Sequence, residues 1–218
     1  MDVLKPKHSG SKLLFENSLL ERLSRTHISV PVTIFFLYAI SLLYWSYSHT
    51  LLTPVVAIAL FLSGLLAFTW VEYQVHRRLF HMETLSEFRK KLQYTIHGVH
   101  HEFPKDTDRL AMPPLLSVTI ATSLLLILSL VLGDMAFSFL AGFLVGYAAY
   151  LLVHYMVHVF RPPKNVFKAL WVNHSIHHYK HGEAIFGVSS PLWDYIYGTM
   201  DKRERRNTDV PEVIENFH

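Results

Sequence analysis

Long apolar runs alternate with polar, histidine-rich segments along the 218 residues of the chain. Four runs contain no Lys, Arg, Asp or Glu, and they cover residues 30–47, 51–70, 115–132 and 136–153. A helix needs about 20 apolar residues to cross a hydrocarbon core of about 30 Å, so runs of this length can span a membrane. Each run is apolar on every side, whereas a soluble surface helix keeps one polar face. The pattern predicts four transmembrane helices.

The predicted spans form two hairpins, because only short turns separate them in pairs. The turns are Ser48-His49-Thr50 and Gly133-Asp134-Met135, and neither holds a Lys or Arg. All 20 Lys and Arg residues lie in the N-terminal segment, in 71–114 or in 154–218. Short cationic loops stay in the cytoplasm, so both termini and the bulk of the protein are expected there. The membrane would be a bacterial inner membrane, or the endoplasmic reticulum in a eukaryote.

The remaining segments complete the prediction of an all-α fold in a single domain, residues 1–218. Segments 71–114 and 154–200 are expected to build a helical cytosolic cap on the spans. Within the cap, residues 86–101 have the pattern of an amphipathic helix with Ser86 as its N-cap. The tail 201–218 is polar and charged, which is typical of a segment that cannot bury enough apolar surface to fold.

Composition narrows the chemistry. The chain has no Cys, which excludes disulfides, thiolate metal sites and cysteine nucleophiles. It has 15 His, nearly as many as its 17 Asp and Glu together. A metal ion would therefore be held by imidazole, a ligand that suits Zn, Fe, Cu and Ni.

Ten of the 15 histidines lie in four short clusters beside the predicted helix ends. These are His76 and His81; His97, His100 and His101; His154 and His158; and His174, His177 and His178. Side chains four apart share a helix face, with Cβ atoms about 5–6 Å apart, so a pair such as His154 and His158 can reach one ion. In each H-x-x-H-H cluster the remaining ring is turned by about 100° and can reach a second ion. His76 and His81, five apart, suit a helix end that unwinds.

Together the clusters predict a centre of two metal ions with about five imidazoles each. Structural zinc usually takes four ligands, so this nitrogen-rich shell favours iron. A single H-x-x-x-H pair is weak evidence, and a patch of interfacial histidines is the alternative for one cluster. Four clusters on one side of the membrane favour the metal centre. The isolated His8, His27, His49 and His218 are expected to be surface residues.

Other polar and aromatic residues on the same side are candidates for supporting roles. Ligating imidazoles usually donate their second N–H to a carboxylate or carbonyl, and candidate partners are Glu72, His181, Asp194, Asp106 and Asp108. For the aspartates, surface pairing with Lys105, Arg109 or Lys180 is the alternative. Candidate pocket-lining residues are Phe80, Tyr94, Tyr155, Trp171, Tyr179 and Trp193, with packing or interfacial anchoring as the alternative.

These motifs resemble the fatty acid hydroxylase superfamily. The resemblance rests on H-R-R-L-F-H, H-G-V-H-H-E-F-P-K-D-T-D-R-L-A-M-P-P, H-Y-M-V-H, H-S-I-H-H-Y-K, G-V-S-S-P-L-W-D and Y-G-T, and it runs from Phe15 to Thr199. Within the superfamily the chain looks most like fatty acid (sphingolipid) 2-hydroxylases, because the P-x-D-x-x-R-L-x-x-P-P segment from Pro104 to Pro114 is generally missing from the sterol oxidases. Fungal and animal relatives carry a haem-cytochrome domain that this sequence lacks, so it resembles the plant and bacterial forms.

The resemblance implies a di-metal monooxygenase that uses O₂ to hydroxylate a fatty acyl chain at the carbon next to its carboxyl group. One metal would take His76, His81, His97, His101 and His177, and the other would take His100, His154, His158, His174 and His178. Iron is the expected metal, and zinc in a structure would stand in for it, since zinc cannot activate O₂. The implied partners are a lipid substrate from the bilayer and a separate electron-donor protein; nucleic acid is not one of them.

Three alternatives remain at this point. The first is a sterol or carotenoid oxidase or a lipid desaturase of the same superfamily. The second is a di-zinc membrane hydrolase, which would work without O₂ but usually has carboxylate ligands that these clusters lack. The third is a non-catalytic metal carrier, which should place polar residues along its spans.

Overall fold

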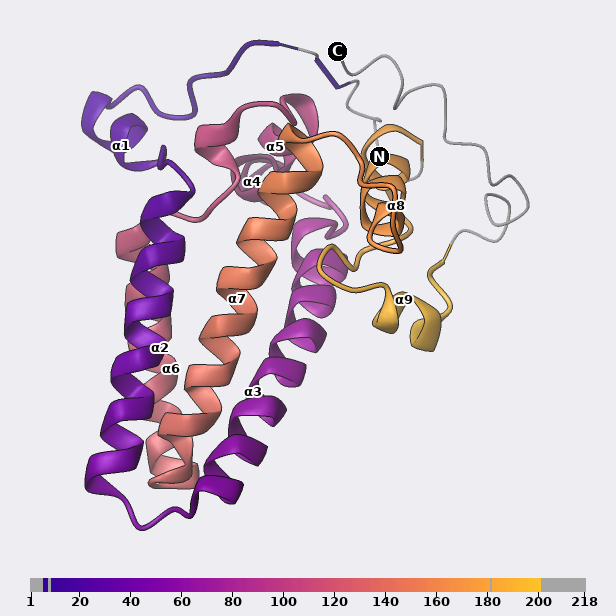
Figure 1. Cartoon of the computed structure of the whole chain (residues 1–218). Coiled ribbons are helices and arrows are strands. Elements are labelled where there is room, and N and C mark those ends of the chain that lie inside the picture. The colour runs from indigo at the N-terminus through magenta and orange to yellow at the C-terminus, as the bar shows by residue number, and fades with distance from the viewer. Residues whose placement is uncertain (1–5, 8, 181, 201–218) are drawn as a thin grey trace. The chain divides into compact units, whose positions relative to one another are not determined.

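A computed structural model describes residues 6, 7, 9–180 and 182–200 (Figure 1). These residues form helices and connecting loops and contain no β-strand, which confirms the all-α prediction. The chain divides into two compact units. The span unit comprises Phe15–Trp70 and Asp108–Leu152, and the cap unit comprises Met1–Leu14, Val71–Thr107 and Val153–His218. The predicted tail 201–218 lies outside the described residues, and the assignment of the whole chain to one domain stays a prediction.

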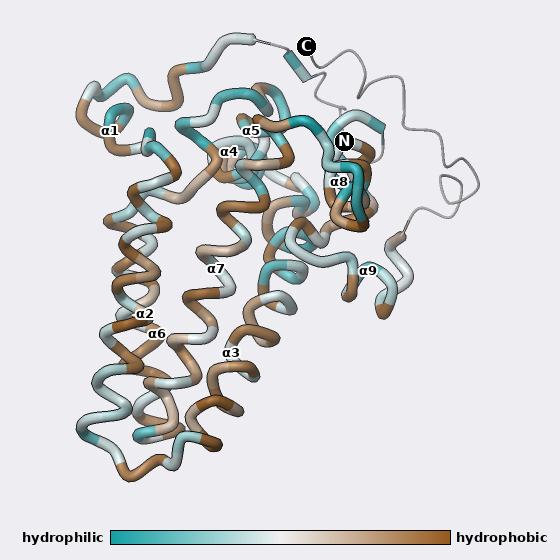
Figure 2. Tube along the Cα trace, in the orientation of Figure 1, coloured by the Kyte–Doolittle hydropathy of each residue, from teal (hydrophilic) through white to brown (hydrophobic). Residues whose placement is uncertain are grey.

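Four long helices dominate the span unit and lie side by side (Figure 1). These helices are α2 (Ser29–His49), α3 (Pro54–Val75), α6 (Pro114–Leu132) and α7 (Met135–Val159). A short helix, α1 (Ser18–Leu23), precedes them. All four are long and apolar enough to cross a membrane, and apolar residues predominate along them (Figure 2). The protein is a membrane protein with the four predicted spans.

Three of the helices end later than predicted. Helix α3 continues to Val75 and α7 to Val159, beyond the apolar runs that ended at residues 70 and 153. Backbone hydrogen bonds do not depend on side-chain polarity, so a helix can run on where hydropathy falls. The first hairpin turn also begins later than predicted, because α2 includes His49 and ends at its C-cap Thr50. The second turn falls at Gly133, whose positive φ of 55° suits glycine.

Helices α3 and α7 approach so closely that glycine is required at their crossing. A Cβ atom on Gly64 would lie 1.9 Å from the carbonyl oxygen of Phe139, and one on Gly142 would lie 1.9 Å from that of Phe61. Lipid supplies no hydrophobic force that drives helices together, so close van der Waals contact between small residues does this work. A buried hydrogen bond of 2.8 Å between the hydroxyls of Ser46 and Ser138 adds a polar link between α2 and α7.

A buried ionic cluster ties α1 to the segment that leads into α6. The guanidinium of Arg109 donates to the Glu21 carboxylate and, at 3.1 Å, to the Ser24 hydroxyl. Arg25 Nε donates to the same carboxylate oxygen at 3.0 Å. Arg109 and Glu21 are only 9% and 8% exposed. Arg109, the arginine of the P-x-D-x-x-R-L segment, therefore links α1 to the segment before α6.

Shorter helices form the cap unit. They are the π-helical η1 (His76–Phe80), α4 (Glu87–Gln93), the π-helical η2 (Tyr94–Gly98), α5 (Val99–Glu102), α8 (Lys168–Tyr179) and α9 (Leu192–Tyr197), and a 3₁₀ turn, η3 (Thr107–Arg109), leads out of the unit. Ser86 caps α4 as predicted, accepting from the backbone N–H of Arg89 at 3.3 Å. The helix predicted over 86–101 is present but is not uniformly α, because η2 interrupts it. Such π segments are rare and frequently occur at functional sites.

Candidate metal centre

The end of α3 widens into a π-turn that brings its two histidines together. The backbone N–H of His81 donates to the carbonyl of His76 at 3.2 Å, which is the five-residue hydrogen bond of a π-helix. Their ring centroids are 5.1 Å apart. The predicted unwinding is therefore wrong: the backbone keeps its hydrogen bonds and adds a residue to the turn, so side chains five apart face the same way.

The described histidines of the four clusters form two groups of five, whose ring nitrogens lie within 4.8 Å of one another in each group. The first histidine set contains His76, His81, His97, His101 and His177. The second histidine set contains His100, His154, His158, His174 and His178. Each H-x-x-H-H cluster thus divides between the sets, and all ten residues belong to the cap unit.

The ring nitrogens of each set lie close enough together to share one ion. In the first set, His97 Nε2 lies 3.1 Å from His76 Nε2 and 3.0 Å from His101 Nε2. Metal–imidazole bonds are about 2.0–2.1 Å long, and two nitrogens about 3.0 Å apart then subtend an angle of about 90° at the metal. Tetrahedral ligands would stand about 3.4 Å apart at the same bond length. The spacing therefore favours a shell of more than four ligands.

Shared protons cannot explain these contacts. In the second set a row of short Nε2···Nε2 distances runs from His100 to His154 at 2.9 Å, on to His158 at 3.2 Å, and on to His174 at 2.8 Å. A neutral imidazole carries one N–H, so a ring nitrogen cannot donate to one neighbour and accept from another at the same time. A cation at the centre of each set would satisfy these lone pairs at once.

Backbone carbonyls orient two rings of the first set. His76 Nδ1 lies 2.6 Å from the carbonyl oxygen of Phe186, and His177 Nδ1 lies 2.8 Å from that of Ala184. A proton on Nδ1 leaves the lone pair on Nε2, which faces the centre of the set. The Nε2 atoms of His81 and His177 are buried and have no hydrogen-bond partner among the described residues. The donor set fits a metal ion.

Burial keeps these rings neutral and able to bind metal. Desolvation, together with neighbouring histidines, lowers the pKa of His81 to about 2, and desolvation lowers that of His177 to about 4. The pKa values of His97, His100, His101, His174 and His178 are also lowered, again mainly by burial. Protonation therefore does not compete with metal binding near neutral pH.

The same shifts predict acid sensitivity of the metal-free protein. His81 and His177 take up protons in the unfolded chain near the ordinary pKa of 6.5, but in the folded protein only near about 2 and about 4. Because the unfolded state binds more protons between these values, stability is full above pH 6.5 and falls as the pH drops below it. We expect the melting temperature in detergent to fall steadily from pH 7 to pH 5. A constant melting temperature over this range would contradict the buried neutral state.

The two sets adjoin each other. The rings of His101 and His178, one from each set, stack with centroids 4.2 Å apart and planes 21° apart. His100 of the second set lies beside His97 and His101 of the first, with centroid distances of 5.6 and 6.1 Å. The two sets lie close enough together to hold a pair of ions, and the two-metal centre that the H-x-x-H-H spacing indicates stays a prediction.

The structure shows different hydrogen-bond partners for the predicted outer residues than the imidazoles. Glu72 and Asp194 are buried, but both accept hydrogen bonds from the backbone of the loop 185–189 and not from imidazoles. Asp106 accepts from the Ser11 hydroxyl at 2.5 Å, the Asp108 carbonyl accepts from Thr26 N–H at 2.9 Å, and His181 lies outside the described residues. Sequence reasoning missed the carbonyls of Ala184 and Phe186, because main-chain atoms leave no side-chain signal.

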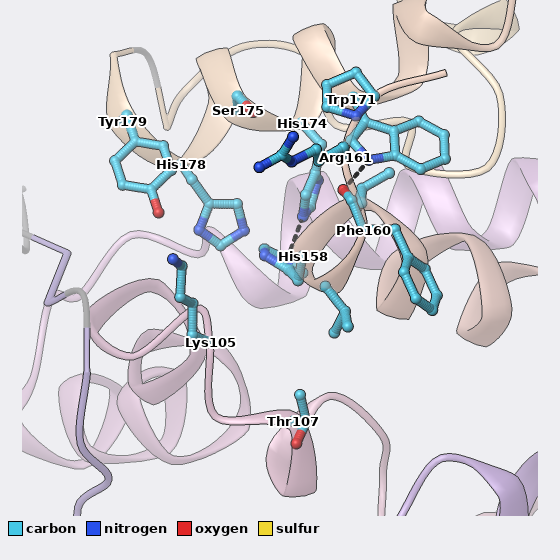
Figure 3. A pocket seen from close by; sticks show the side chains of 13 residues that line it. Lys105, Thr107, His158, Phe160, Arg161, Trp171, His174, Ser175, His178 and Tyr179 are labelled. Atoms are coloured by element: carbon cyan, nitrogen blue, oxygen red, sulfur yellow. Dashed lines mark hydrogen bonds between the residues drawn. The ribbon is translucent and has the colours of Figure 1, made fainter. Parts of the chain in front are cut away.

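A cavity of about 280 Å³ opens beside the second histidine set. His158, His174 and His178 line one part of it (Figure 3). Apolar groups include Val157, Phe160 and Trp171, whose indole donates to the Phe160 carbonyl at 2.8 Å. Polar groups are supplied by Lys105, Arg161 and Tyr179, and the Lys105 side chain extends towards His178 (Figure 3). Of the predicted pocket aromatics, Trp171 and Tyr179 line this cavity, whereas Phe80 stacks on His97.

Known proteins are similar to this chain in sequence and fold. The fatty acid hydroxylase family model matches residues 61–199. Fatty acid 2-hydroxylase of Rattus norvegicus is 32% identical over 213 residues, covering 88% of this chain and 57% of that protein. Ceramide very long chain fatty acid hydroxylase scs7 of Schizosaccharomyces pombe is 37% identical over 214 residues, covering 90% of this chain and 58% of that protein.

A solved structure agrees with these matches. Full-length scs7p, of which only the hydroxylase domain is visible, superposes with a TM-score of 0.83 at 31% identity, covering 91% of this chain and 76% of that one. The chain spans somewhat more than half the length of the two curated relatives. Sequence and fold agree, and the chain belongs to the fatty acid hydroxylase family.

Proposed function

We propose that this protein is a membrane-bound di-iron monooxygenase that hydroxylates a fatty acyl chain at C2, in a free fatty acid or in a sphingolipid. The observation that carries the proposal is the pair of buried five-histidine sets. The named relatives are a fatty acid 2-hydroxylase and a ceramide very long chain fatty acid hydroxylase, which supports this choice over sterol or carotenoid substrates.

The ten histidines would hold the metals, five for each ion. Two iron ions in these sets would supply the redox chemistry that reduces O₂ and oxidises a C–H bond. The overall reaction is R–H + O₂ + 2e⁻ + 2H⁺ → R–OH + H₂O. The protein's own residues would orient the rings, keep them unprotonated and exclude water, since seven of the ten histidines are buried.

The cavity beside the second histidine set is the proposed place for the reacting end of the lipid. Its volume of about 280 Å³ is too small for a whole long-chain lipid, so it would hold the carboxyl end and the first carbons. Val157, Phe160 and Trp171 would pack against the chain, while Lys105, Arg161 and Tyr179 would bind the polar carbonyl or head group. C2 adjoins that carbonyl carbon, so a polar end bound in this way would bring C2 near the histidines.

The proposed topology places the cap and both termini in the cytoplasm. It rests on the Lys and Arg residues, none of which occurs in either hairpin turn. The reaction consumes two electrons, and a separate electron-donor protein would deliver them to the cap. Its docking would depend on charge complementarity, for which the cationic cap segments are suited.

Product analysis tests this function. The metal-free protein is loaded anaerobically with Fe(II), mixed with a reductase system and either a fatty acid or a ceramide, and exposed to ¹⁸O₂. We expect mass spectrometry to find one ¹⁸O atom at C2 of the acyl chain, and no product without O₂ or reductant. A double bond in place of a hydroxyl group would indicate a desaturase. Product labelled from H₂¹⁸O in the absence of O₂ would indicate a hydrolase.

A further inference from the structure

A short loop behind the first histidine set is fixed by an unusual run of backbone contacts. Five consecutive N–H groups, from Ile185 to Ser189, each donate to a defined acceptor. Ile185 is 2% exposed and has a φ of 58°, a left-handed conformation that strains a β-branched residue. Such strain persists only where the surroundings impose it. The surroundings here are two buried carboxylates and Thr199.

Asp194 binds the first half of the loop with both oxygens. Oδ1 accepts from Phe186 N–H and Oδ2 accepts from Gly187 N–H, each at 2.8 Å. Asp194 is itself fully buried, and the Thr199 hydroxyl donates to its Oδ1 at 2.7 Å. A Cβ atom on Gly187 would lie 2.7 Å from Asp194 Oδ2 and 2.2 Å from the carbonyl oxygen of Ser190, so only glycine fits.

Glu72 binds the second half of the loop with a different pattern. A single oxygen, Oε1, accepts from Val188 N–H at 2.7 Å and from Ser189 N–H at 2.9 Å. The other oxygen, Oε2, accepts from the Ser189 hydroxyl. Because of this difference, replacing each carboxylate by its amide should have a different effect on the loop. An amide in place of Asp194 turns one backbone contact into an N–H facing an N–H, whereas an amide in place of Glu72 keeps its oxygen for both N–H groups and can donate to Ser189.

The loop held in this way presents its carbonyl groups to the histidines. Ala184 and Phe186 accept from Nδ1 of His177 and His76, and both rings belong to the first histidine set. In the second set, Nδ1 of His100 and of His178 has no hydrogen-bond partner among the described residues. The two loop carbonyls that the carboxylates position therefore both contact rings of the first set.

We propose that Glu72 and Asp194 are positioning residues for the first metal alone, acting through the main chain of the loop 184–189. The inference rests on the proposed metal-binding role of the histidines. Loss of an outer partner of a metal-bound histidine typically weakens metal affinity by about 10- to 100-fold. Disturbing the loop should lower the affinity for the metal of the first histidine set by that factor and leave the affinity for the other metal unchanged.

The test measures bound Zn²⁺ per protein after dialysis against a graded chelator series. We expect Asp194→Asn to lose one ion at a chelator strength about 10- to 100-fold lower than the strength at which wild type loses an ion. Below that strength, wild type should keep two ions. Gly187→Ala, which displaces the loop without removing a charge, should behave like Asp194→Asn, and so should Glu72→Ala. Glu72→Gln should keep both ions, as should the control Asp134→Asn in the exposed hairpin turn.

Double variants identify which ion is lost. These variants are compared at a chelator strength at which Asp194→Asn keeps one ion. Adding His97→Ala, in the first set, should leave that one ion bound, whereas adding His154→Ala, in the second set, should leave none. Equal weakening of both ions, or wild-type retention in Asp194→Asn and Gly187→Ala, would overturn the inference. A wild-type protein that binds no Zn²⁺ would instead defeat the proposed metal centre, so the two failures are distinguishable.

Discussion

His97→Ala should leave a protein with one metal ion and no measurable hydroxylation. His97 Nε2 contacts the Nε2 atoms of both His76 and His101, so its removal takes a ligand from the middle of the first histidine set. Loss of an outer partner alone costs up to about 100-fold in affinity or activity, and loss of a ligand should cost more. Metal content and product formation from ¹⁸O₂ measure the two effects on the same sample.

The matched control is His27→Ala. His27 is an exposed histidine near the start of α2, outside both sets, and among the described hydrogen bonds its ring contacts only Ser29. We expect it to retain two ions and full activity. The complementary variant His154→Ala should lose the other ion and be equally inactive. Full activity in either ligand variant would remove that histidine from the proposed centre.

Arg109→Ala should destabilise the protein by about 3–5 kcal/mol, the usual effect of removing one partner of a buried ion pair. The side chain of Arg109 is 3% exposed and that of Glu21 is 11% exposed, so the carboxylate would lose its closest cation in a place that water reaches poorly. Arg25 at 3.0 Å would compensate only in part, because its side chain is 31% exposed. Reversible denaturant unfolding in detergent, or melting temperature, measures the loss.

Two further variants separate charge from packing at this position. Arg22→Ala, on the exposed side of α1, should change stability by less than about 0.5 kcal/mol, as surface substitutions usually do. The double variant Glu21→Gln with Arg109→Ala should recover part of the loss, because it leaves no unpaired buried charge. An Arg109→Ala protein as stable as wild type would show that the ionic cluster contributes nothing.

The features that could be predicted from the sequence are those that depend on the type and spacing of side chains. Charge-free runs mark the spans, and the spacing of His154 from His158 or His174 from His178 reports which rings share a helix face. The division of ten histidines into two sets followed from that spacing together with the family resemblance. Each of these features depends on a periodicity that side chains carry directly.

The features that sequence could not predict depend on the backbone. A π-turn and an unwound end both suit histidines five apart, and only the hydrogen bond from His81 to His76 separates them. The partners of His76 and His177 are main-chain carbonyls, which any residue type supplies. Glu72 was predicted from its position one turn before His76, but its bond to a loop more than a hundred residues later needs the tertiary fold.

Each imidazole of the two histidine sets is a neutral ligand, so a pair of divalent ions would bring four positive charges into a shell that cancels none of them. In carboxylate-bridged centres the ligands themselves neutralise the ions. Here the described carboxylates Glu72 and Asp194 stand behind the loop, engaged with its amides. Such an electron-poor centre would favour the reduced over the oxidised metal, and it would attract anions to any open coordination position.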